Sequence, residues 1–406
     1  MSWPKNTPEV DDETWQDWQA RFGESDRAAG FDIRREFQPF NQMNDMFTRA
    51  FWDPKVRSDH TDGFFASYRM EAAPRRGEGF AQRDFALRNA AWAISDIISN
   101  RAEGTGLREG FQGAIGADTP VAPSQVEPMT PEKEAHEIKR LARFFGADIV
   151  GITEIDERWH YSHRPDTRDM SPVEEALPEG MTHVIVMGHA MDFDLVETYP
   201  SALAGASTGR EYSHEAAIVI QLATYIRNLG FEAVASMNDT ALVIPYAIKA
   251  GLGEYGRNQM VLTPEFGPRV RFSKIFTNLP LANDAPRRLG LAAYCQSCTI
   301  CADSCPPKAL PKGAPDLGPD NRSAIRGVCK WTSDAEKCFG YWAKLKTDCA
   351  ICMRVCPFNR RYTRWQERLW RWLALGRAPG LAQWWEARRG KRKRLRPRDW
   401  WNGKQP

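Results

Sequence analysis

The chain has 406 residues, of which 42% are hydrophobic and 26% are charged, and its formal net charge is +3 at pH 7. This composition is ordinary for a globular protein, and the length suggests two or three structural units. No apolar stretch approaches the roughly 20 residues that a membrane-spanning helix needs, and no apolar run follows Arg34-Arg35, which excludes a twin-arginine signal. We therefore expect a cytoplasmic protein.

Regular patterns are sparse in residues 1–129 and dense in residues 130–289. The first region shows helical spacing at 14–22 and 85–99, and we expect it to contribute to packing and to a pocket. The second region predicts, in order, a helix at 131–145 ended by Gly146, strands at 148–153 and 183–188, a helix at 211–229 ended by Gly230, a strand at 231–236, a short helix at 242–250 and a strand at 270–276. Such alternation predicts a layered α/β or α+β domain.

Two cysteine runs mark residues 290–360 as a metal-binding module. They read Cys295-x-x-Cys298-x-x-Cys301-x-x-x-Cys305-Pro306 and Cys349-x-x-Cys352-x-x-x-Cys356-Pro357. In bacterial ferredoxins, three closely spaced thiolates hold one cluster and the cysteine before proline ligates the other. The spacing predicts two [4Fe–4S] clusters, one held by Cys295, Cys298, Cys301 and Cys356, the other by Cys305, Cys349, Cys352 and one cysteine further upstream. Spacing alone leaves Cys338 and Cys329 open for that last position.

Structural zinc and disulfides are the competing interpretations of the cysteines. Zinc sites use two CxxC pairs with a longer separation and no trailing Cys-Pro. Nearly all the cysteines are used by the predicted clusters, which implies a reducing compartment. We therefore favour the clusters.

The segment Gly251-Leu252-Gly253-Glu254-Tyr255-Gly256 matches the GxGxxG pattern. A dinucleotide-binding fingerprint follows a strand, opens a helix and has an acid about 20 residues further on. Here a short predicted helix precedes the glycines, and residues 268–282 contain no acid. We interpret the segment as a turn that lets the backbone approach some large ligand.

The order of several segments resembles the corrinoid-dependent reductive dehalogenases. They are Asn238-Asp239-Thr240-Ala241-Leu242, Ala250-Gly251-Leu252-Gly253-Glu254, Gly256-Arg257, Thr263-Pro264-Glu265-Phe266-Gly267-Pro268 and Asn278-Leu279-Pro280-Leu281, followed by the cysteine module. The stretch from Trp331 through Lys337-Cys338-Phe339-Gly340 to Trp342 resembles the segment before that family's second cluster, which favours Cys338 over Cys329. The resemblance covers residues 130–360 strongly and the N-terminal third loosely. Epoxyqueuosine reductases are more distantly similar.

This resemblance implies a nitroreductase-like domain that holds a base-off cobalamin without a protein ligand on cobalt. A bacterial ferredoxin-like two-cluster module is inserted into it or appended to it. The Asp-x-His-x-x-Gly motif that supplies a lower histidine in other corrinoid proteins is absent from the sequence. The expected cofactor contacts are Gly251, Gly253, Gly256, Arg257, Thr263 and Phe266.

The resemblance also implies that Tyr212, Asn238 and Arg271 line a substrate pocket above cobalt. Replacing a carbon–halogen bond by a carbon–hydrogen bond needs two electrons and one proton. A phenol is a weak acid at neutral pH, and a neighbouring guanidinium favours its anion, so Tyr212 would donate the proton and Arg271 would stabilise the tyrosinate. The alternatives are a packing aromatic for Tyr212, a turn residue for Asn238 and a surface ion-pair partner for Arg271.

We therefore expect a reductive dehalogenase that acts on an organohalide, with a halogenated aromatic as the expected substrate. A ferredoxin, flavodoxin or reductase would supply electrons, because no flavin or nicotinamide module is visible in the sequence. The alternatives are an epoxyqueuosine reductase-like enzyme and a protein that only transfers electrons or handles corrinoid.

Residues 361–406 form a basic tail rich in tryptophan and arginine. It has 14 Lys and Arg and three acids, a net charge of +11. Because the whole chain carries +3, residues 1–360 carry a net charge of −8. Trp365, Leu369, Trp372 and Leu373 follow helical spacing. The tail can cap the cluster module as core, lie on an anionic membrane surface as a peripheral contact, or dock an acidic electron donor. We expect no nucleic-acid binding, because the rest of the chain is acidic and shows no recognition motif.

Overall fold

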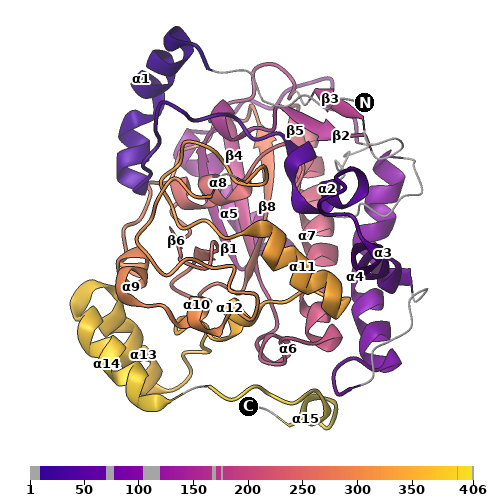
Figure 1. The fold of residues 1–406 in the computed structure, drawn as a ribbon. Coiled ribbons are helices and arrows are strands. Elements are labelled where there is room, and N and C mark those ends of the chain that lie inside the picture. Colours follow the sequence, from indigo (N-terminus) through magenta and orange to yellow (C-terminus); the bar gives the residue numbers. More distant parts are fainter. Residues whose placement is uncertain are drawn as a thin grey trace.

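A four-stranded antiparallel sheet lies at the centre of the fold (Figure 1). The computed structural model describes residues 10–69, 77–103, 119–166, 171–174, 177–319, 321–390 and 392–404. The strands are ordered β1 (Ile149–Glu154), β4 (His183–Ala190), β8 (Val270–Thr277) and β5 (Ala233–Ser236). All three pairings are antiparallel, which is the α+β form of the predicted fold class.

Helices cover both faces of this sheet. On one face lie α5 (Pro131–Phe145) and α7 (Ala202–Asn228), and α4 (Gln82–Glu103) packs on the outside of α7. On the other face lies α8 (Val243–Lys249), against which α1 (Asp12–Ala29) packs. The inner residues of β4 are therefore buried on both sides, with Val184, Ile185, Val186 and Met187 fully inaccessible.

Helix α5 follows its sequence signals, whereas α7 does not. Pro131 occupies the first turn of α5, and Gly146 ends it at a positive φ of 121°, as predicted. Helix α7 begins at Ala202, nine residues before the predicted start, so Tyr212 lies well inside the helix rather than near its start. The missed segment lacks an amphipathic pattern because Ala202, Leu203 and Ala204 are all fully buried.

The remaining elements form smaller units around the sheet. Before it come η1 (Gln42–Asn44), α2 (Met46–Trp52), α3 (Asp59–Ala66) and η2 (Ser67–Arg69). Within it are inserted η3 (Glu157–Trp159), β2 (His163–Pro165), β3 (Pro172–Glu174), α6 (Phe193–Val196), β6 (Glu254–Tyr255) and β7 (Val261–Leu262). The cysteine module follows with α9 (Leu291–Ser297), α10 (Ile300–Ser304), α11 (Ala335–Leu345) and α12 (Ile351–Arg354).

The tail folds into a helical hairpin at the edge of the molecule (Figure 1). It consists of α13 (Trp365–Trp372), the irregular turn η4 (Leu373–Arg377) and α14 (Pro379–Arg389), followed by α15 (Pro397–Trp401). Trp370 is fully buried, whereas Trp365, Leu369 and Trp372 are exposed. The apolar spacing read from the sequence therefore marks mainly the outer face of α13, and the core contact is made by a tryptophan outside that pattern.

No helix in the described ranges combines the length and the apolar composition that crossing a bilayer requires.

Candidate active site

The fold brings Tyr212, Asn238 and Arg271 together from three different elements. Tyr212 lies on α7, Asn238 follows β5 and Arg271 lies on β8. The Asn238 side-chain amide donates a hydrogen bond to the Tyr212 phenol oxygen at 2.6 Å, and the Arg271 guanidinium donates to the same oxygen. The guanidinium carbon of Arg271 also lies 3.9 Å from the centroid of the Tyr212 ring. Both contacts use the phenol oxygen as an acceptor, so neither consumes the hydroxyl hydrogen.

Neighbouring side chains fix this triad in place. The Trp92 ring on α4 stacks on the Tyr212 ring at 4.6 Å between centroids with a 25° interplanar angle. The Gln42 side-chain amide donates to the backbone carbonyl oxygen of Asn238 at 3.1 Å. Burial lowers the pKa of Arg271 to about 10, partly offset by Tyr199 and Asp348. The guanidinium therefore remains charged at neutral pH.

Tyr212 also has two buried carboxyl neighbours on the same helix. Burial raises the pKa of Glu211 to about 7 and that of Glu215 well above its ordinary value. For Glu215 the charge of Glu211 adds to the effect of burial, whereas Lys274 partly offsets it.

The triad lines a cavity of about 330 Å³, which is the size of a small-ligand site. Its walls are Gln42, Asp45, Phe47, Tyr68, Trp92, Tyr161, Met191, Tyr199, Thr208, Tyr212, Asn238, Met260, Arg271, Trp342, Asp348, Cys349, Ala350 and Met353. Five of these residues come from the N-terminal region, where the sequence shows no motif that singles them out. Aromatic rings dominate the walls, and Arg271 and Asp348 supply opposite charges.

Asp348 forms a second polar centre of the cavity. Its carboxylate accepts hydrogen bonds from the Tyr199 hydroxyl at 2.5 Å and the Thr208 hydroxyl at 2.9 Å. Asp348 directly precedes Cys349, so this polar centre joins the cavity to the cysteine module. Sequence reasoning missed it, because an aspartate beside a cysteine run carries no signal of its own.

The seven cysteines of the two runs lie near one another and near Cys338. Burial raises the pKa of the Cys356 thiol, and the nearby thiols of Cys295, Cys301 and Cys298 raise it further. Burial likewise raises the pKa of Cys349 to about 12, with added effects from Cys338 and Cys305. The pKa of the Cys352 thiol is raised by burial and by Cys338, Cys349, Cys301 and Cys305. Cys356 thus has neighbours from the first run, whereas Cys352 has neighbours from both runs, and the assignment of each thiol to a cluster stays a prediction.

The chemistry of these thiols fits iron–sulfur clusters. Buried thiols with raised pKa values are poor thiolates by themselves, and metal binding favours the deprotonated form. Within the described part of the chain, no three His, Cys, Asp or Glu side chains converge as they would on a single ion. Ligands of a four-iron cubane surround a much larger body than one ion and need not converge in that way.

Cys338 and Cys329 have different surroundings. Beyond burial, the pKa of Cys338 is raised by Cys305, whereas that of Cys329 is raised by Asp32. The backbone amide of Cys329 also donates to the Asp32 carbonyl oxygen at 2.9 Å. Cys329 therefore lies beside the N-terminal region.

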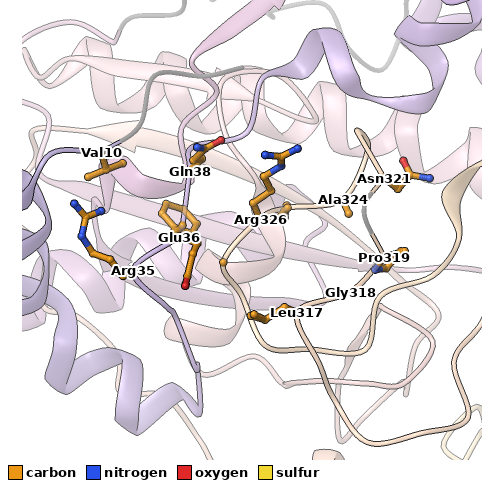
Figure 2. Close-up of a pocket in the computed structure, with 13 residues that line it drawn as sticks. Val10, Arg35, Glu36, Gln38, Leu317, Gly318, Pro319, Asn321, Ala324 and Arg326 are labelled. Atoms are coloured by element: carbon orange, nitrogen blue, oxygen red, sulfur yellow. The ribbon is translucent and has the colours of Figure 1, made fainter. Parts of the chain in front are cut away.

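A larger cavity of about 470 Å³ adjoins the first, and the two share Tyr161 and Asn238 as wall residues. Its walls include Trp159, Leu242 and Trp331, and among the described residues no histidine lines it. It also shares Ala324 and Ile325 with a third cavity of about 640 Å³. Figure 2 shows this third cavity between the segment around Arg35 and the loop that carries Arg326. The two larger cavities thus lie in sequence beside the triad, each sharing two wall residues with the next.

The predicted cofactor contacts lie mainly against protein atoms. The Arg257 guanidinium donates to five backbone carbonyl groups, including those of Cys295 and Cys298. A Cβ atom at Gly253 would lie 2.3 Å from the Leu262 carbonyl oxygen, and one at Gly251 2.6 Å from that of Ala285. The same hairpin instead contributes Glu254, Tyr255 and Gln259 to the 470 Å³ cavity.

Thr263 and Phe266 likewise contact protein in the described structure. The Thr263 hydroxyl donates to the Gly267 carbonyl oxygen at 3.2 Å, and the Phe266 ring lies 5.4 Å from the Arg269 guanidinium carbon. A Cβ atom at Gly256 would lie 2.8 Å from the Asn258 side-chain oxygen. Their predicted contacts with a cofactor stay predictions.

Two family models match the chain. Residues 172–281 match the reductive dehalogenase subunit model, and residues 294–359 match the 4Fe-4S double cluster binding domain. The tetrachloroethene reductive dehalogenase of Sulfurospirillum multivorans is 32% identical over 375 residues, which cover 81% of this chain and 74% of the relative. That of Dehalobacter restrictus is 33% identical over 270 residues, covering 56% and 48%. Epoxyqueuosine reductases are matched more weakly.

A solved reductive dehalogenase, described in terms of B12-dependent dehalogenation, shares the fold. The TM-score is 0.67 at 22% identity, and the match covers 87% of this chain and 46% of that chain. The chain thus spans about half the length of that structure and of the Dehalobacter relative.

Proposed function

Because the chain belongs to the reductive dehalogenase family, we propose that it catalyses the two-electron reductive cleavage of a carbon–halogen bond in a small organohalide. The overall conversion consumes one organohalide, two electrons and one proton, and releases the hydrogen-substituted product and a halide ion. The observation that carries the proposal is the convergence of Tyr212, Asn238 and Arg271 on one cavity wall beside the cysteine module.

Named residues would hold the cofactors. The seven cysteines of the two runs and Cys338 would ligate two [4Fe–4S] clusters, with Cys338 rather than Cys329 as the eighth ligand. A base-off corrinoid would occupy the cavities beyond Tyr161 and Asn238, in a nitroreductase-like domain. When bound, the corrinoid supplies electrons at the carbon–halogen bond, and the clusters supply the route by which an external donor replaces them.

The protein's own part is to deliver the proton. Tyr212 holds the transferable proton on its phenol oxygen, at the wall of the cavity. As that proton leaves, negative charge develops on the oxygen, which already accepts hydrogen bonds from Asn238 and Arg271. These two donors stabilise the tyrosinate without reorganisation, because they are in place before the transfer.

The cavity walls favour a halogenated aromatic substrate. Trp92, Tyr161, Tyr212 and Trp342 present ring surfaces to a space of about 330 Å³, and aromatic rings pack well against one another. A charged guanidinium also suits a substrate that bears a phenolate. A chlorinated ethene is the second candidate, because relatives at 32–33% identity are named for tetrachloroethene.

Anaerobic turnover of the corrinoid- and iron-loaded chain tests this proposal. We expect a bromophenol to release bromide and phenol, with tetrachloroethene assayed in parallel as the competing substrate. Release of chloride from tetrachloroethene alone would assign the second substrate class. Absence of halide release from both would leave an epoxyqueuosine reductase-like or purely electron-transferring protein.

Replacement of Tyr212 by phenylalanine separates proton delivery from packing. The substitution removes only the hydroxyl group, so iron content, corrinoid loading and cofactor reduction should be unchanged, while turnover falls by roughly 10²–10⁴-fold. Tyr225→Phe is the matched control, because Tyr225 lies on the same helix and its hydroxyl bonds to Glu137 at 2.5 Å, outside the cavity lining. Near wild-type dehalogenation by Tyr212→Phe would leave Tyr212 as a packing residue.

A further inference from the structure

The outer face of the α13–α14 hairpin exposes a dense group of large apolar side chains. On α13, Trp365, Leu369 and Trp372 are 67%, 38% and 56% exposed at positions i, i+4 and i+7. On α14, Leu381 and Trp384 are 50% and 54% exposed. Twelve large apolar side chains are exposed in the described chain, and five of them lie on these two short helices. Exposed apolar groups concentrated in this way mark an interaction surface.

The inner face of the hairpin is firmly attached to the protein. Trp370 is fully buried and donates from its indole nitrogen to the Ala382 carbonyl oxygen at 3.0 Å. Gln383 donates to the Ser297 hydroxyl at 2.6 Å, and the buried carboxylate of Glu386 pairs with Arg360. The exposed side chains therefore lie on a fixed platform, and their exposure does not result from poor packing of the tail.

Cations flank this apolar face. Arg364, Arg388 and Arg389 are exposed, and the Arg388 guanidinium carbon lies 3.7 Å from the centroid of the Trp384 ring. The tail as a whole carries +11, whereas residues 1–360 carry −8. Tryptophan, leucine and arginine on one surface are the combination that binds the interface of an anionic membrane.

The composition and shape of the outer face favour a lipid surface over an acidic electron donor. The hairpin covers part of the cysteine module, because Trp370, Ala374 and Ala382 pack in one core cluster with Cys295 and Cys356. None of the three cavities described above takes a wall residue from the hairpin, whereas five large apolar side chains protrude from it.

We propose that the outer face of the α13–α14 hairpin binds peripherally to an anionic lipid surface. The indole and leucine side chains enter the interface between headgroups and acyl chains, and the arginines pair with the anionic headgroups. This binding is independent of the chemistry in the Tyr212 cavity.

Co-sedimentation of the holo-form with vesicles tests the proposal. Vesicles of phosphatidylcholine with about one third phosphatidylglycerol should bind the protein, and vesicles of phosphatidylcholine alone should bind it weakly. The double variant Trp365→Ser/Trp384→Ser should bind the anionic vesicles at least about tenfold more weakly, because two large apolar surfaces are lost. Arg388→Gln/Arg389→Gln should weaken binding and reduce its dependence on salt.

Phe144→Ser is the matched control, because Phe144 is 79% exposed on α5, away from the hairpin. It should bind vesicles like the wild type, and all variants should keep their iron content. Failure of the wild type to bind anionic vesicles, or equal binding by the tryptophan double variant, would overturn the proposal. Unchanged vesicle binding together with slower reduction by an acidic ferredoxin would reassign the face to a protein partner.

Discussion

At the scale of single residues, two cysteines compete for one ligand position. The Cys338 thiol is affected by Cys305, whereas the Cys329 thiol lies beside Asp32 at the N-terminal region. We predict that Cys338→Ala loses one cluster, so that iron falls from about eight to about four per chain, while Cys329→Ala retains about eight. Iron analysis of the anaerobically reconstituted variants checks this. Loss of iron from Cys329→Ala alone would reverse the assignment.

The Tyr212 triad shows why a substitution that conserves charge does not always conserve a site. Lysine at position 271 keeps a positive charge but does not reproduce the planar guanidinium, which both donates to the phenol oxygen and lies over the ring. We therefore regard Arg271, like Tyr212, as specified by geometry as well as by charge.

At the scale of elements, two glycines decide how closely α4 approaches α7. A Cβ atom at Gly209 would lie 2.3 Å from the Trp92 ring, and one at Gly205 2.6 Å from an Asp348 carboxylate oxygen. Both glycines face the helix that carries Trp92, and the Trp92 ring in turn stacks on Tyr212. The small side chains at the start of α7 thus shape the wall of the cavity.

We predict that Gly209→Ala lowers turnover by about tenfold or more, because Trp92 must shift from its stack on Tyr212, and a small misplacement of reacting groups is costly. Iron content should stay normal, since the cysteine ligands are elsewhere. Gly340→Ala on α11 is the control, because a Cβ atom there meets nothing within 4 Å and alanine favours a helix. Steady-state rates of both variants test this, and unchanged turnover by Gly209→Ala would contradict it.

At the scale of the whole molecule, a buried group of four charges ties the N-terminal helix to the sheet. Arg158 donates to Asp26 at 2.8 and 2.9 Å and to Asp156 at 2.8 and 2.6 Å. Lys249 on α8 completes the group, 2.8 Å from Asp156 and 3.1 Å from Asp26. The two acids and two bases balance one another, which is what makes their burial tolerable.

We predict that Asp26→Ala destabilises the protein by about 3–5 kcal/mol, because it leaves Asp156 as the one carboxylate that faces the two buried cations Arg158 and Lys249. Asp17→Ala is the control on the same helix. Its carboxylate pairs with Arg21 at 3.1 Å, but both side chains are about half exposed, so the loss should stay below about 1 kcal/mol. Urea unfolding under anaerobic conditions compares the two variants. Equal midpoints would show that α1 contributes little to the stability of the fold.

The sequence by itself determined the features that depend on local spacing. The cysteine runs predict the double-cluster module, Pro131 and Gly146 set the ends of α5, and alternation places β8 with Arg271 within it. Each follows from chemistry within a few residues of the chain: cluster ligands need fixed intervals, and prolines and glycines limit local backbone angles.

Tertiary structure alone decided the features that depend on distant partners. Sequence spacing predicted a helix from Glu211, whereas α7 begins at Ala202 after the N-cap Ser201, and its first turns are buried on all sides and so show no helical pattern of apolar residues. Trp92 and Asp348 lie far apart in the chain and carry no motif, yet both line the cavity of Tyr212. Trp365 and Trp370 are the same residue type, so hydrophobicity cannot predict which of them is buried. The position of α13 against the cysteine module buries Trp370 and leaves Trp365 exposed. The physical reason is that burial and charge pairing belong to the assembled core, which local patterns do not contain.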